Sequence, residues 1–504
     1  MPHPLQWGKQ ETDLFAKIFS GLVLSVAATL PGLALAEGAV TKACRVPDFP
    51  QEVQCGKVQR PLDPAHPEGR KIDINYVVVP SQDRNKLPDA IFLLAGGPGQ
   101  SAISVAGWGQ FAFSRLNRRR DLVFVDQRGT GRSAPLNCTE LENNADMFDA
   151  EQAFQSSQKC LSRLQALPYG DLKQFTTTIA MQDLDAVRQA QGYAKINLVG
   201  VSYGTRAGLE YLRQFPQSVR RVILDGVVPP DARLPSSDAQ LALDAVFADC
   251  VKDARCNAAY PRLAERWSKL LAGLPRQVTL QHPRLGSEMQ ILMTRDLVVS
   301  MVHKSLYAPM NVSGLPYALT QAEQGKYAPL VALSGATNLP GQGSIAYGMH
   351  FSVWCAEEYA RLPDVPAADD FSRVMDGMYK KICEKWPRGN VPAEFYTLPK
   401  SPVPVLLLSG GIDPVTPTPR GAHVAEALGP LAIHLSVNNA GHGLMSQGGC
   451  LRELAYRYLN AKDDQEANKV DTSCVRQIPR PMAWQLPLPM TAASAGATGN
   501  GGKP

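Results

Sequence analysis

Residues 196–206 constrain the fold more than any other segment of this chain of 504 residues. The apolar run 196–199 predicts a buried strand, and it leads directly into Gly200-Val-Ser202-Tyr-Gly204, a Gly-x-Ser-x-Gly turn. Apolar residues then recur at helical spacing until Pro216, which predicts a helix. A serine between a buried strand and a helix is typical of a nucleophile elbow, in which glycines let the two backbones approach closely. We therefore predict that Ser202 is a nucleophile, with a purely structural glycine turn as the alternative.

An acid and a histidine follow Ser202, each on a loop after a predicted strand. The run 403–408 predicts a strand that leads to Asp413, and the run 433–437 predicts another that leads to His442 between two glycines. The order Ser, Asp, His is the one in which an α/β-hydrolase fold supplies its triad. We therefore predict that Asp413 orients His442, and that His442 acts as the general base.

Two further residues are weaker candidates for these roles. Asp225 ends a predicted strand at 221–224 and could replace Asp413 as the acid, although we favour a role in capping the turn before Val227. His434 lies within its predicted strand, so we expect it to be a core or surface residue.

A glycine-rich loop upstream predicts an oxyanion hole. The predicted strand 90–94 runs into Ala95-Gly-Gly-Pro-Gly-Gln-Ser101, whose small residues leave backbone N–H groups bare. Acyl transfer builds negative charge on a carbonyl oxygen, and preorganised N–H donors stabilise that charge. We assign the two donors to Gly97 and to Tyr203, the residue after the nucleophile. A second such loop, 126–133, follows a predicted strand at 121–125 and lacks the Gly-Lys-Ser/Thr ending of a phosphate-binding loop.

These motifs together resemble the prolyl aminopeptidase family of α/β-hydrolases, and within it the branch of secreted tripeptidyl aminopeptidases. The segments that carry the resemblance are Gly96-Gly-Pro-Gly99, Asp126-Gln-Arg-Gly-Thr-Gly-Arg-Ser133, Gly200-Val-Ser-Tyr-Gly204, Asp413 and Gly441-His-Gly443. The resemblance spans roughly residues 70–460. It implies an α/β fold with a mostly parallel central sheet flanked by helices, and a serine exopeptidase that removes residues from free peptide N-termini.

The chain departs from the cytosolic prolyl aminopeptidases at two positions. Ala95 stands where they usually have His, and Tyr203 stands where they usually have Trp. Both departures weaken any expectation of single-proline release and favour the secreted branch.

The N-terminal segment predicts export. Residues 18–35 are apolar and rich in Gly and Ala, lysines precede them, and Ala34 and Ala36 supply the small residues of a cleavage site. We predict a signal peptide at 1–36 that is cleaved before Glu37, rather than an uncleaved anchor, because Pro31 and Gly32 interrupt the run. No later apolar run reaches about 18 residues, so we expect no membrane anchor after cleavage, and a periplasmic or extracellular enzyme.

Ten cysteines in an exported chain predict disulfides. Sequence cannot fix the connectivity, and our hypothesis is five sequential pairs: Cys44–Cys55, Cys138–Cys160, Cys250–Cys256, Cys355–Cys383 and Cys450–Cys474. No Cys-x-x-Cys or His-Glu-x-x-His pattern occurs, so we expect neither a metal nor another cofactor. The formal charge of +5 is small for this length, so nucleic acid is not expected as a partner, and the run 118–120 of three arginines is expected to be a solvated face.

The predicted core elements stop near Pro230 and resume near Ser401, and the pattern between them is mostly helical, for example at 239–251 and 260–274. We expect this insertion to be a cap that controls access to Ser202. The expected domains are a signal peptide at 1–36, the first part of the hydrolase core at 37–235, a mainly helical cap at 236–395, the second part of the core at 396–480, and a disordered tail at 481–504.

Glu357 and Glu358 are the candidates for binding a substrate amine. An aminopeptidase desolvates the ammonium of its substrate and needs acidic groups near the cleft, and these two carboxylates lie beside Cys355 in the predicted cap. On a helix they would diverge by about 100°, so only one is expected to face the cleft. A solvated helix surface is the alternative.

We therefore predict a secreted serine exopeptidase whose partners are peptides with a free N-terminus. One alternative is a carboxylic ester hydrolase on the same triad, since a triad alone does not fix the substrate. The other is a non-catalytic binding protein on a hydrolase scaffold, which a complete Ser, Asp and His set argues against.

Overall fold

The computed structural model describes residues 41–47, 49, 51–141, 150–232, 237–281, 286–335, 345–361, 367–447 and 449–485. All of them belong to one compact unit, Gly38–Pro504. The predicted signal peptide and the low-complexity end of the tail lie outside the described residues. None of the described helices has the length and apolar character of a membrane-spanning segment.

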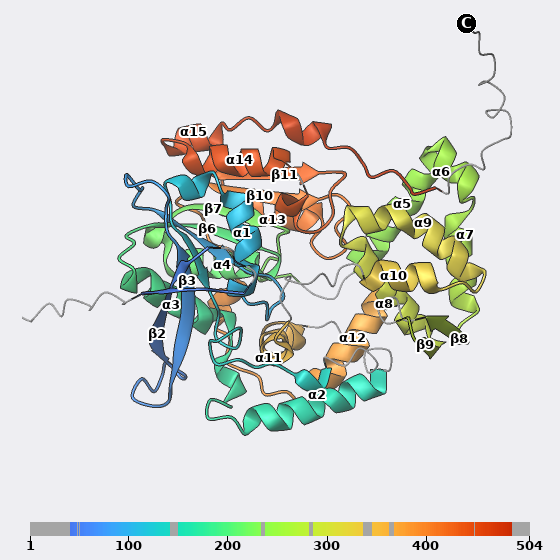
Figure 1. Ribbon diagram of the computed structural model, residues 1–504, viewed down its shortest axis with the longest axis horizontal. Helices are drawn as coiled ribbons and strands as arrows, with labels where there is room; N and C mark the ends of the chain where they lie inside the picture. The colour runs from blue at the N-terminus through green and yellow to red at the C-terminus, as the bar shows by residue number, and fades with distance from the viewer. Residues whose placement is uncertain are drawn as a thin grey trace, which may run out of the picture. The chain divides into compact units, whose positions relative to one another are not determined.

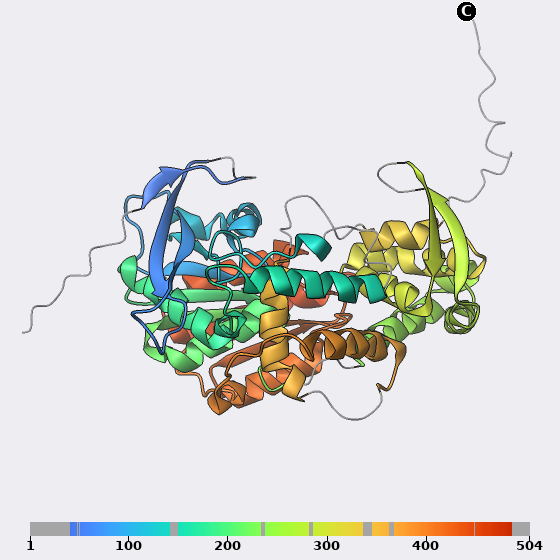
Figure 2. The ribbon, with the colours of Figure 1, turned by 90° about the horizontal axis from the view of Figure 1, so that it is seen from below.

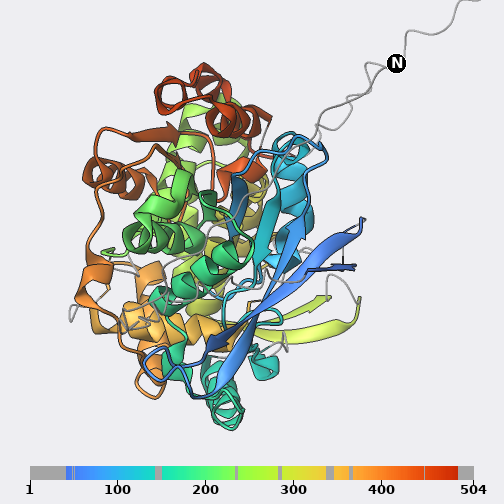
Figure 3. The same cartoon turned by 90° about the vertical axis from the view of Figure 1, so that its left-hand side faces the viewer.

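Nine of the described strands form one sheet, in the order β1-β2-β3-β5-β4-β6-β7-β10-β11 (Figure 1). The strands are β1 Lys42–Cys44, β2 Val53–Pro61, β3 Lys71–Val79, β4 Ala90–Leu94, β5 Leu122–Val125, β6 Ile196–Val201, β7 Val219–Asp225, β10 Val405–Gly410 and β11 Ala432–Val437. From β5 to β11 every neighbouring pair is parallel, whereas β1, β2 and β3 pair antiparallel. Figure 3 shows β2 and β3, in blue, as long strands along one edge. The mostly parallel sheet predicted from the sequence is confirmed.

The parallel strands other than β11, which lies at the edge of the sheet, are buried on both faces, which explains why they are mostly apolar runs in the sequence. In β4, Ala90, Phe92 and Leu94 pack into one cluster of buried side chains. Ile91 and Leu93 point the other way and pack into a second cluster. Because successive side chains of a strand alternate between faces, helices must cover both sides of the sheet.

The helices occupy the connections and the insertion. They are α1 Ala106–Phe113, α2 Ala150–Gln165, α3 Thr177–Ala190, α4 Tyr203–Gln214, α5 Asp238–Lys252, α6 Ala254–Ala259, α7 Leu263–Ala272, α8 Arg295–Leu306, α9 Pro309–Glu323, α10 Ala328–Gly335, α11 Tyr347–Glu357, α12 Asp370–Cys383, α13 Thr418–Leu428, α14 Gly449–Asn460 and α15 Asp464–Asn468. Helix α7 is shorter at both ends than the helix predicted at 260–274. At its N-terminal end, Arg262 adopts a left-handed conformation, and α7 begins only after it.

The insertion between β7 and β10 packs in two ways. Helices α5 to α10 build a hydrophobic cluster of their own, around residues such as Leu243, Trp267 and Leu315. Side chains of α11, such as Phe351 and Val353, join the cluster of the central sheet instead. The insertion also contains an antiparallel hairpin, β8 Arg276–Gln281 and β9 Glu288–Met293, drawn in yellow-green in Figure 2. The sequence analysis missed this hairpin.

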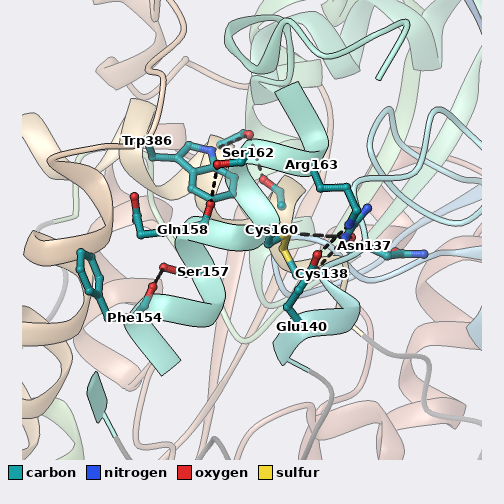
Figure 4. Close-up of a disulfide and its surroundings, with 12 residues drawn as sticks. Asn137, Cys138, Glu140, Phe154, Ser157, Gln158, Cys160, Ser162, Arg163 and Trp386 are labelled. Atoms are coloured by element: carbon teal, nitrogen blue, oxygen red, sulfur yellow. Dashed lines mark hydrogen bonds and ion pairs between the residues drawn. A yellow bond between two sulfur atoms is a disulfide. The ribbon is translucent and has the colours of Figure 1, made fainter. Parts of the chain in front are cut away.

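Five disulfides join Cys44–Cys55, Cys138–Cys160, Cys250–Cys256, Cys355–Cys383 and Cys450–Cys474, which confirms the sequential pairing. Figure 4 shows how one of them fixes α2: Cys160 bonds to Cys138. One turn along the same helix, Arg163 donates to the Glu140 carboxylate at 2.7 and 2.9 Å. The disulfide and the ion pair therefore attach α2 to the same short segment.

The expectation that residues 118–120 form a solvated face is wrong for Arg120. Its side chain is buried and donates to the Asp89 carboxylate at 2.9 Å and to Asn460 at 3.1 Å. A buried guanidinium is tolerated because a carboxylate neutralises it.

Candidate active site

Ser202 lies at a sharp turn between β6 and α4. Its φ of 57° and ψ of −124° are strained for a residue with a side chain, and such strain is typical of a nucleophile elbow. The two glycines of the motif are required for space. A Cβ on Gly200 would lie 2.3 Å from the carbonyl oxygen of Gly204, and one on Gly204 would lie 2.2 Å from that of Leu94. The turn is therefore the tight strand-to-helix connection that the sequence predicts.

Asp413 and His442 form a hydrogen-bonded pair. Asp413 follows β10, and its Oδ2 accepts from His442 Nδ1 at 2.8 Å and from Thr416 Oγ1 at 2.5 Å. Its Oδ1 accepts from the backbone N–H groups of Val415 and Thr416, each at 2.9 Å. The carboxylate is buried, and both of its oxygens accept hydrogen bonds, so its orientation toward His442 is fixed.

Asp413 and His442 shift each other's pKa values. Burial alone would raise the pKa of Asp413, but the charge and hydrogen bond of His442 and the bonds from Thr416 and Val415 hold that pKa below its usual value. Burial alone would lower the pKa of His442, but the Asp413 carboxylate raises it above its usual value. An imidazole with a raised pKa is a stronger base for a serine hydroxyl.

Asp225 connects the serine and histidine loops and does not pair with His442. Its backbone oxygen accepts from the N–H of Ser202 at 2.9 Å. Its carboxylate accepts from the N–H groups of Leu444 at 2.8 Å and Met445 at 2.9 Å. The expected role of capping the turn before Val227 is therefore wrong, because the carboxylate points to the turn after His442. The next residue, Gly226, also lies against the imidazole, since a Cβ there would be 3.2 Å from His442 Cε1.

The candidate oxyanion donors are the N–H groups of Gly97 and Tyr203, two residues that line the same cavity as Ser202. Gly97 has a φ of 111°, and a Cβ on it would lie 2.7 Å from the nitrogen of Gly99, so only glycine fits. Tyr203 begins α4, and the first N–H groups of a helix have no partner within it. Its hydroxyl points away into the core, 2.7 Å from Thr177 Oγ1.

Ser202, Gly97 and Tyr203 line one cavity with about 930 Å³ of empty space, part of it open to solvent. Half of its lining residues come from the insertion, and these are aromatic or apolar. The residues that contribute this part of the wall are Ala239, His303, Tyr307, His350, Val353, Trp354, Phe371, Met375 and Tyr379. Pro414, Val415 and Thr416 place the acid's loop at the same cavity.

Glu357 and Glu358 are both buried and both lie against one guanidinium, that of Arg206 on α4. Arg206 Nη1 is 3.6 Å from Glu357 Oε2 and forms a closer ion pair with Glu358 Oε1. Neither the predicted divergence nor the solvated surface is found, because α11 ends at Glu357 and both side chains turn toward Arg206. Burial raises the pKa of Glu357 to about 7, although Arg206 and the N–H of Thr177 act against it.

This cluster of Arg206, Glu357 and Glu358 adjoins the cavity through Arg206, which is the member that lines it. Thr177 connects it to the nucleophile's neighbour, because its N–H donates to Glu357 Oε1 at 2.8 Å and its hydroxyl meets Tyr203. Glu358 Oε2 is buried and has no hydrogen-bond partner among the described residues. The cluster therefore holds an acceptor that remains available.

Residues 89–448 match the sequence profile of the family described as alpha/beta hydrolase fold. The chain belongs to this family. Its sheet order, its elbow serine and the acid and histidine loops after β10 and β11 agree with the membership.

Three curated relatives are similar, two of them along most of their length and one along about half of it. The serine protease Hip1 of Mycobacterium tuberculosis (strain H37Rv) is 27% identical over 459 residues, which cover 82% of this chain and 86% of that protein. The tripeptidyl aminopeptidase of Streptomyces lividans is 31% identical over 260 residues, 46% of this chain and 48% of that protein. Carboxylesterase B of M. tuberculosis (strain CDC 1551) is 28% identical over 425 residues, 75% of this chain and 78% of that protein. The protein is thus a serine hydrolase of the α/β-hydrolase fold.

The structure adds residues that sequence reasoning missed. Thr416 donates to the Asp413 carboxylate, Arg206 pairs with the two glutamates, and the carbonyl oxygen of Tyr307 accepts from the backbone N–H of His442 at 3.0 Å. Thr416 lies three residues after Asp413 in a turn-forming loop, a spacing at which side chains often bond to each other. Arg206 and Tyr307 carry no local signal, because their partners are distant in the chain.

Proposed function

We propose that the protein is an exported serine peptidase that acts on peptides with a free N-terminus through Ser202, His442 and Asp413. The observations that carry the catalytic part are the bond between Asp413 and His442 and the strained turn at Ser202, which lines the same cavity as the loop of the acid. The relatives named as a serine protease and a tripeptidyl aminopeptidase support peptide substrates.

His442 takes the proton of the Ser202 hydroxyl as its oxygen attacks the scissile carbonyl. Asp413 holds the imidazole in the tautomer that leaves Nε2 free, and it stabilises the imidazolium that forms. The N–H groups of Gly97 and Tyr203 hold the oxyanion. His442 then protonates the leaving amine, and a water that it activates hydrolyses the acyl-enzyme.

The amine would bind at the cluster of Arg206, Glu357 and Glu358. When both carboxylates are ionised, they outnumber the single guanidinium, so the cluster carries a buried excess of negative charge. An ammonium that reaches Glu358 beside Arg206 would neutralise that charge and use the free Oε2 acceptor. The insertion between β7 and β10 would act as the cap that shapes the route to this cluster. The five disulfides support export to an oxidising compartment.

Ester hydrolysis is the second candidate function, and two observations favour it. The cavity wall is largely aromatic and apolar, and Arg206 faces the cavity in front of the glutamates. The relative named as a carboxylesterase matches 75% of the chain. An ester needs the triad and the oxyanion hole but not a carboxylate for an amine.

A panel of chromogenic peptides, free or acetylated at the N-terminus, tests the proposal when it is run beside simple esters. Acetylation removes the ammonium, so the substrate no longer pairs with the Glu358 carboxylate, and the loss of one partner of a buried ion pair costs on the order of 3–5 kcal/mol, or at least a hundredfold in kcat/KM. Glu358→Gln should weaken cleavage of free-amine peptides and spare esters. Glu384→Gln, at an exposed glutamate, is the matched control. Equal rates on free and acetylated peptides would remove the aminopeptidase assignment and leave an endopeptidase or esterase.

A further inference from the structure

We propose that His350 is a positioning residue that holds the oxyanion loop, residues 96–100, in its catalytic conformation. The proposal rests on the oxyanion role given above to Gly97. His350 lies on α11, in the insertion, so an element outside the hydrolase core would set the geometry of a part of the active site.

The segment at the start of α11 is attached to three consecutive residues of the oxyanion loop. His350 Nδ1 lies 3.0 Å from the carbonyl oxygen of Pro98. The N–H of Ala346 donates to the carbonyl oxygen of Gly99 at 2.9 Å. Ile345 pairs with Gln100 in an isolated antiparallel β-bridge. The histidine makes the one side-chain contact of the three, so it is the contact that a substitution can remove.

The hydrogen bonds fix the tautomer of His350. A carbonyl oxygen only accepts, so Nδ1 must carry the proton and donate to Pro98. In the neutral ring Nε2 is then an acceptor, and it lies 2.7 Å from the hydroxyl of Tyr379, which donates to it. Burial lowers the pKa of His350 to about 4, so the ring is neutral near pH 7. Each nitrogen of the His350 imidazole therefore has a hydrogen-bond partner: Nδ1 donates to Pro98, and Nε2 accepts from Tyr379.

The imidazole is itself held firmly. It lies parallel to Trp354, with an interplanar angle of 16° and ring centroids 6.0 Å apart, and Trp354 in turn stacks on Tyr379 with centroids 4.2 Å apart. His350 is on α11 and Tyr379 is on α12, and the disulfide Cys355–Cys383 joins these two helices about one turn further along each. The disulfide therefore holds the helix that carries His350 against the helix that carries Tyr379.

The loop needs such support because it is rich in glycine. Gly97 and Gly99 both adopt positive φ values, of 111° and 102°, and glycine pays a large entropy cost when it is ordered. Within the loop, the N–H of Gln100 donates to the Gly96 carbonyl at a long 3.3 Å. Oxyanion donors act only when they are preorganised to within about 0.5 Å of the charge that develops. Loss of the Pro98 contact should therefore weaken transition-state binding more than ground-state binding.

The test compares His350→Leu, which removes the donor, with His350→Asn, whose amide nitrogen can occupy the place of Nδ1. A fluorophosphonate probe measures the reactivity of Ser202 without any peptide or ester preference, and a peptide boronic acid measures affinity for a tetrahedral adduct. We expect His350→Leu to lower the labelling rate and the boronate affinity by about 10- to 100-fold, a fraction of the loss for a whole oxyanion donor. Affinity for a peptide product should change by less than about threefold, and His350→Asn should restore labelling to within about fivefold of wild type.

His434→Leu is the matched control. This histidine is partly buried, bonds to Ser409 Oγ at 3.1 Å, and lies in β11 away from the cavity. It should label at the wild-type rate. Tyr379→Phe is the second variant if His350→Leu does not fold, and we expect it to lower labelling by about 3- to 10-fold because it frees the ring to rotate.

A folded His350→Leu protein with wild-type labelling and boronate affinity would overturn the proposal. His350→Asn as slow as His350→Leu would also overturn it, because the contact through Nδ1 would then be irrelevant. Wild-type enzyme that is labelled normally but cuts no peptide refutes the proposed peptidase function alone, and the comparison of labelling rates still decides the role of His350.

Discussion

Asp413→Asn is the substitution whose outcome can be worked out atom by atom. Two backbone N–H groups, of Val415 and Thr416, point at the position of Oδ1. They force the asparagine to place its carbonyl oxygen there, because an amide NH₂ would oppose both donors. The amide nitrogen must then occupy the position of Oδ2, 2.8 Å from His442 Nδ1.

An N–H in that position donates to His442 Nδ1 and so fixes the proton of the neutral ring on Nε2. That tautomer cannot accept the Ser202 proton. The loss expected for a wrong tautomer is about 10⁴-fold in kcat, or about 5.5 kcal/mol of transition-state stabilisation. The pKa of His442 should also fall, because burial lowers it and the carboxylate that raised it is gone. The acid limb of kcat/KM, where the imidazole loses its proton, should therefore move to lower pH.

The assay is steady-state hydrolysis of a chromogenic peptide across pH, with thermal unfolding to show that the variant is folded. If an ester is the better substrate, the same measurement applies to it. Folded Asp413→Asn with turnover within tenfold of wild type would refute the tautomer argument. An acid limb that moves to higher pH would contradict the assigned electrostatics.

Ser202→Ala should fold normally and lose roughly 10⁶-fold in turnover, and near wild-type turnover of a folded variant would remove it as the nucleophile. Asp225→Asn offers one acceptor to two backbone N–H groups, so we expect a loss of about 1–3 kcal/mol in the free energy of unfolding, measured with denaturant, and a smaller loss of turnover than for Asp413→Asn. The reverse ranking of turnover would make Asp225 the acid. N-terminal sequencing of exported protein should begin at Glu37, and thiol titration under denaturing conditions should find few or no free cysteines, whereas ten free thiols would contradict the disulfides.

Local sequence predicted the parallel part of the sheet well. Each of its strands is a largely apolar run that ends at a turn, and the inner ones, as at 90–94 and 403–408, are buried on both faces. The acid and histidine loops were found for the same reason, because each follows such a strand. Glycines at the elbow marked a place where backbones come too close for side chains.

Contacts between distant segments were not predictable. The two glutamates were expected to diverge, and only the position of Arg206, about 150 residues earlier, brings them together. The hairpin β8–β9 does alternate in β8, with Val278 and Leu280 more buried than their neighbours, but its strands are mostly exposed and lie within a helical region. The contact between His350 and Pro98 joins residues 252 positions apart and leaves no periodic signal.

The sequential pairing of the cysteines has a consequence for how the chain matures. Ten thiols admit on the order of 10³ pairings, yet every cysteine here bonds to the next one along the chain, over separations of 6 to 28 residues. If the polypeptide is exported as proposed and leaves a translocation pore N-terminus first, each thiol meets its native partner before any later cysteine has emerged. Oxidation in order of emergence then yields the native set directly, and the demand on a disulfide isomerase is small.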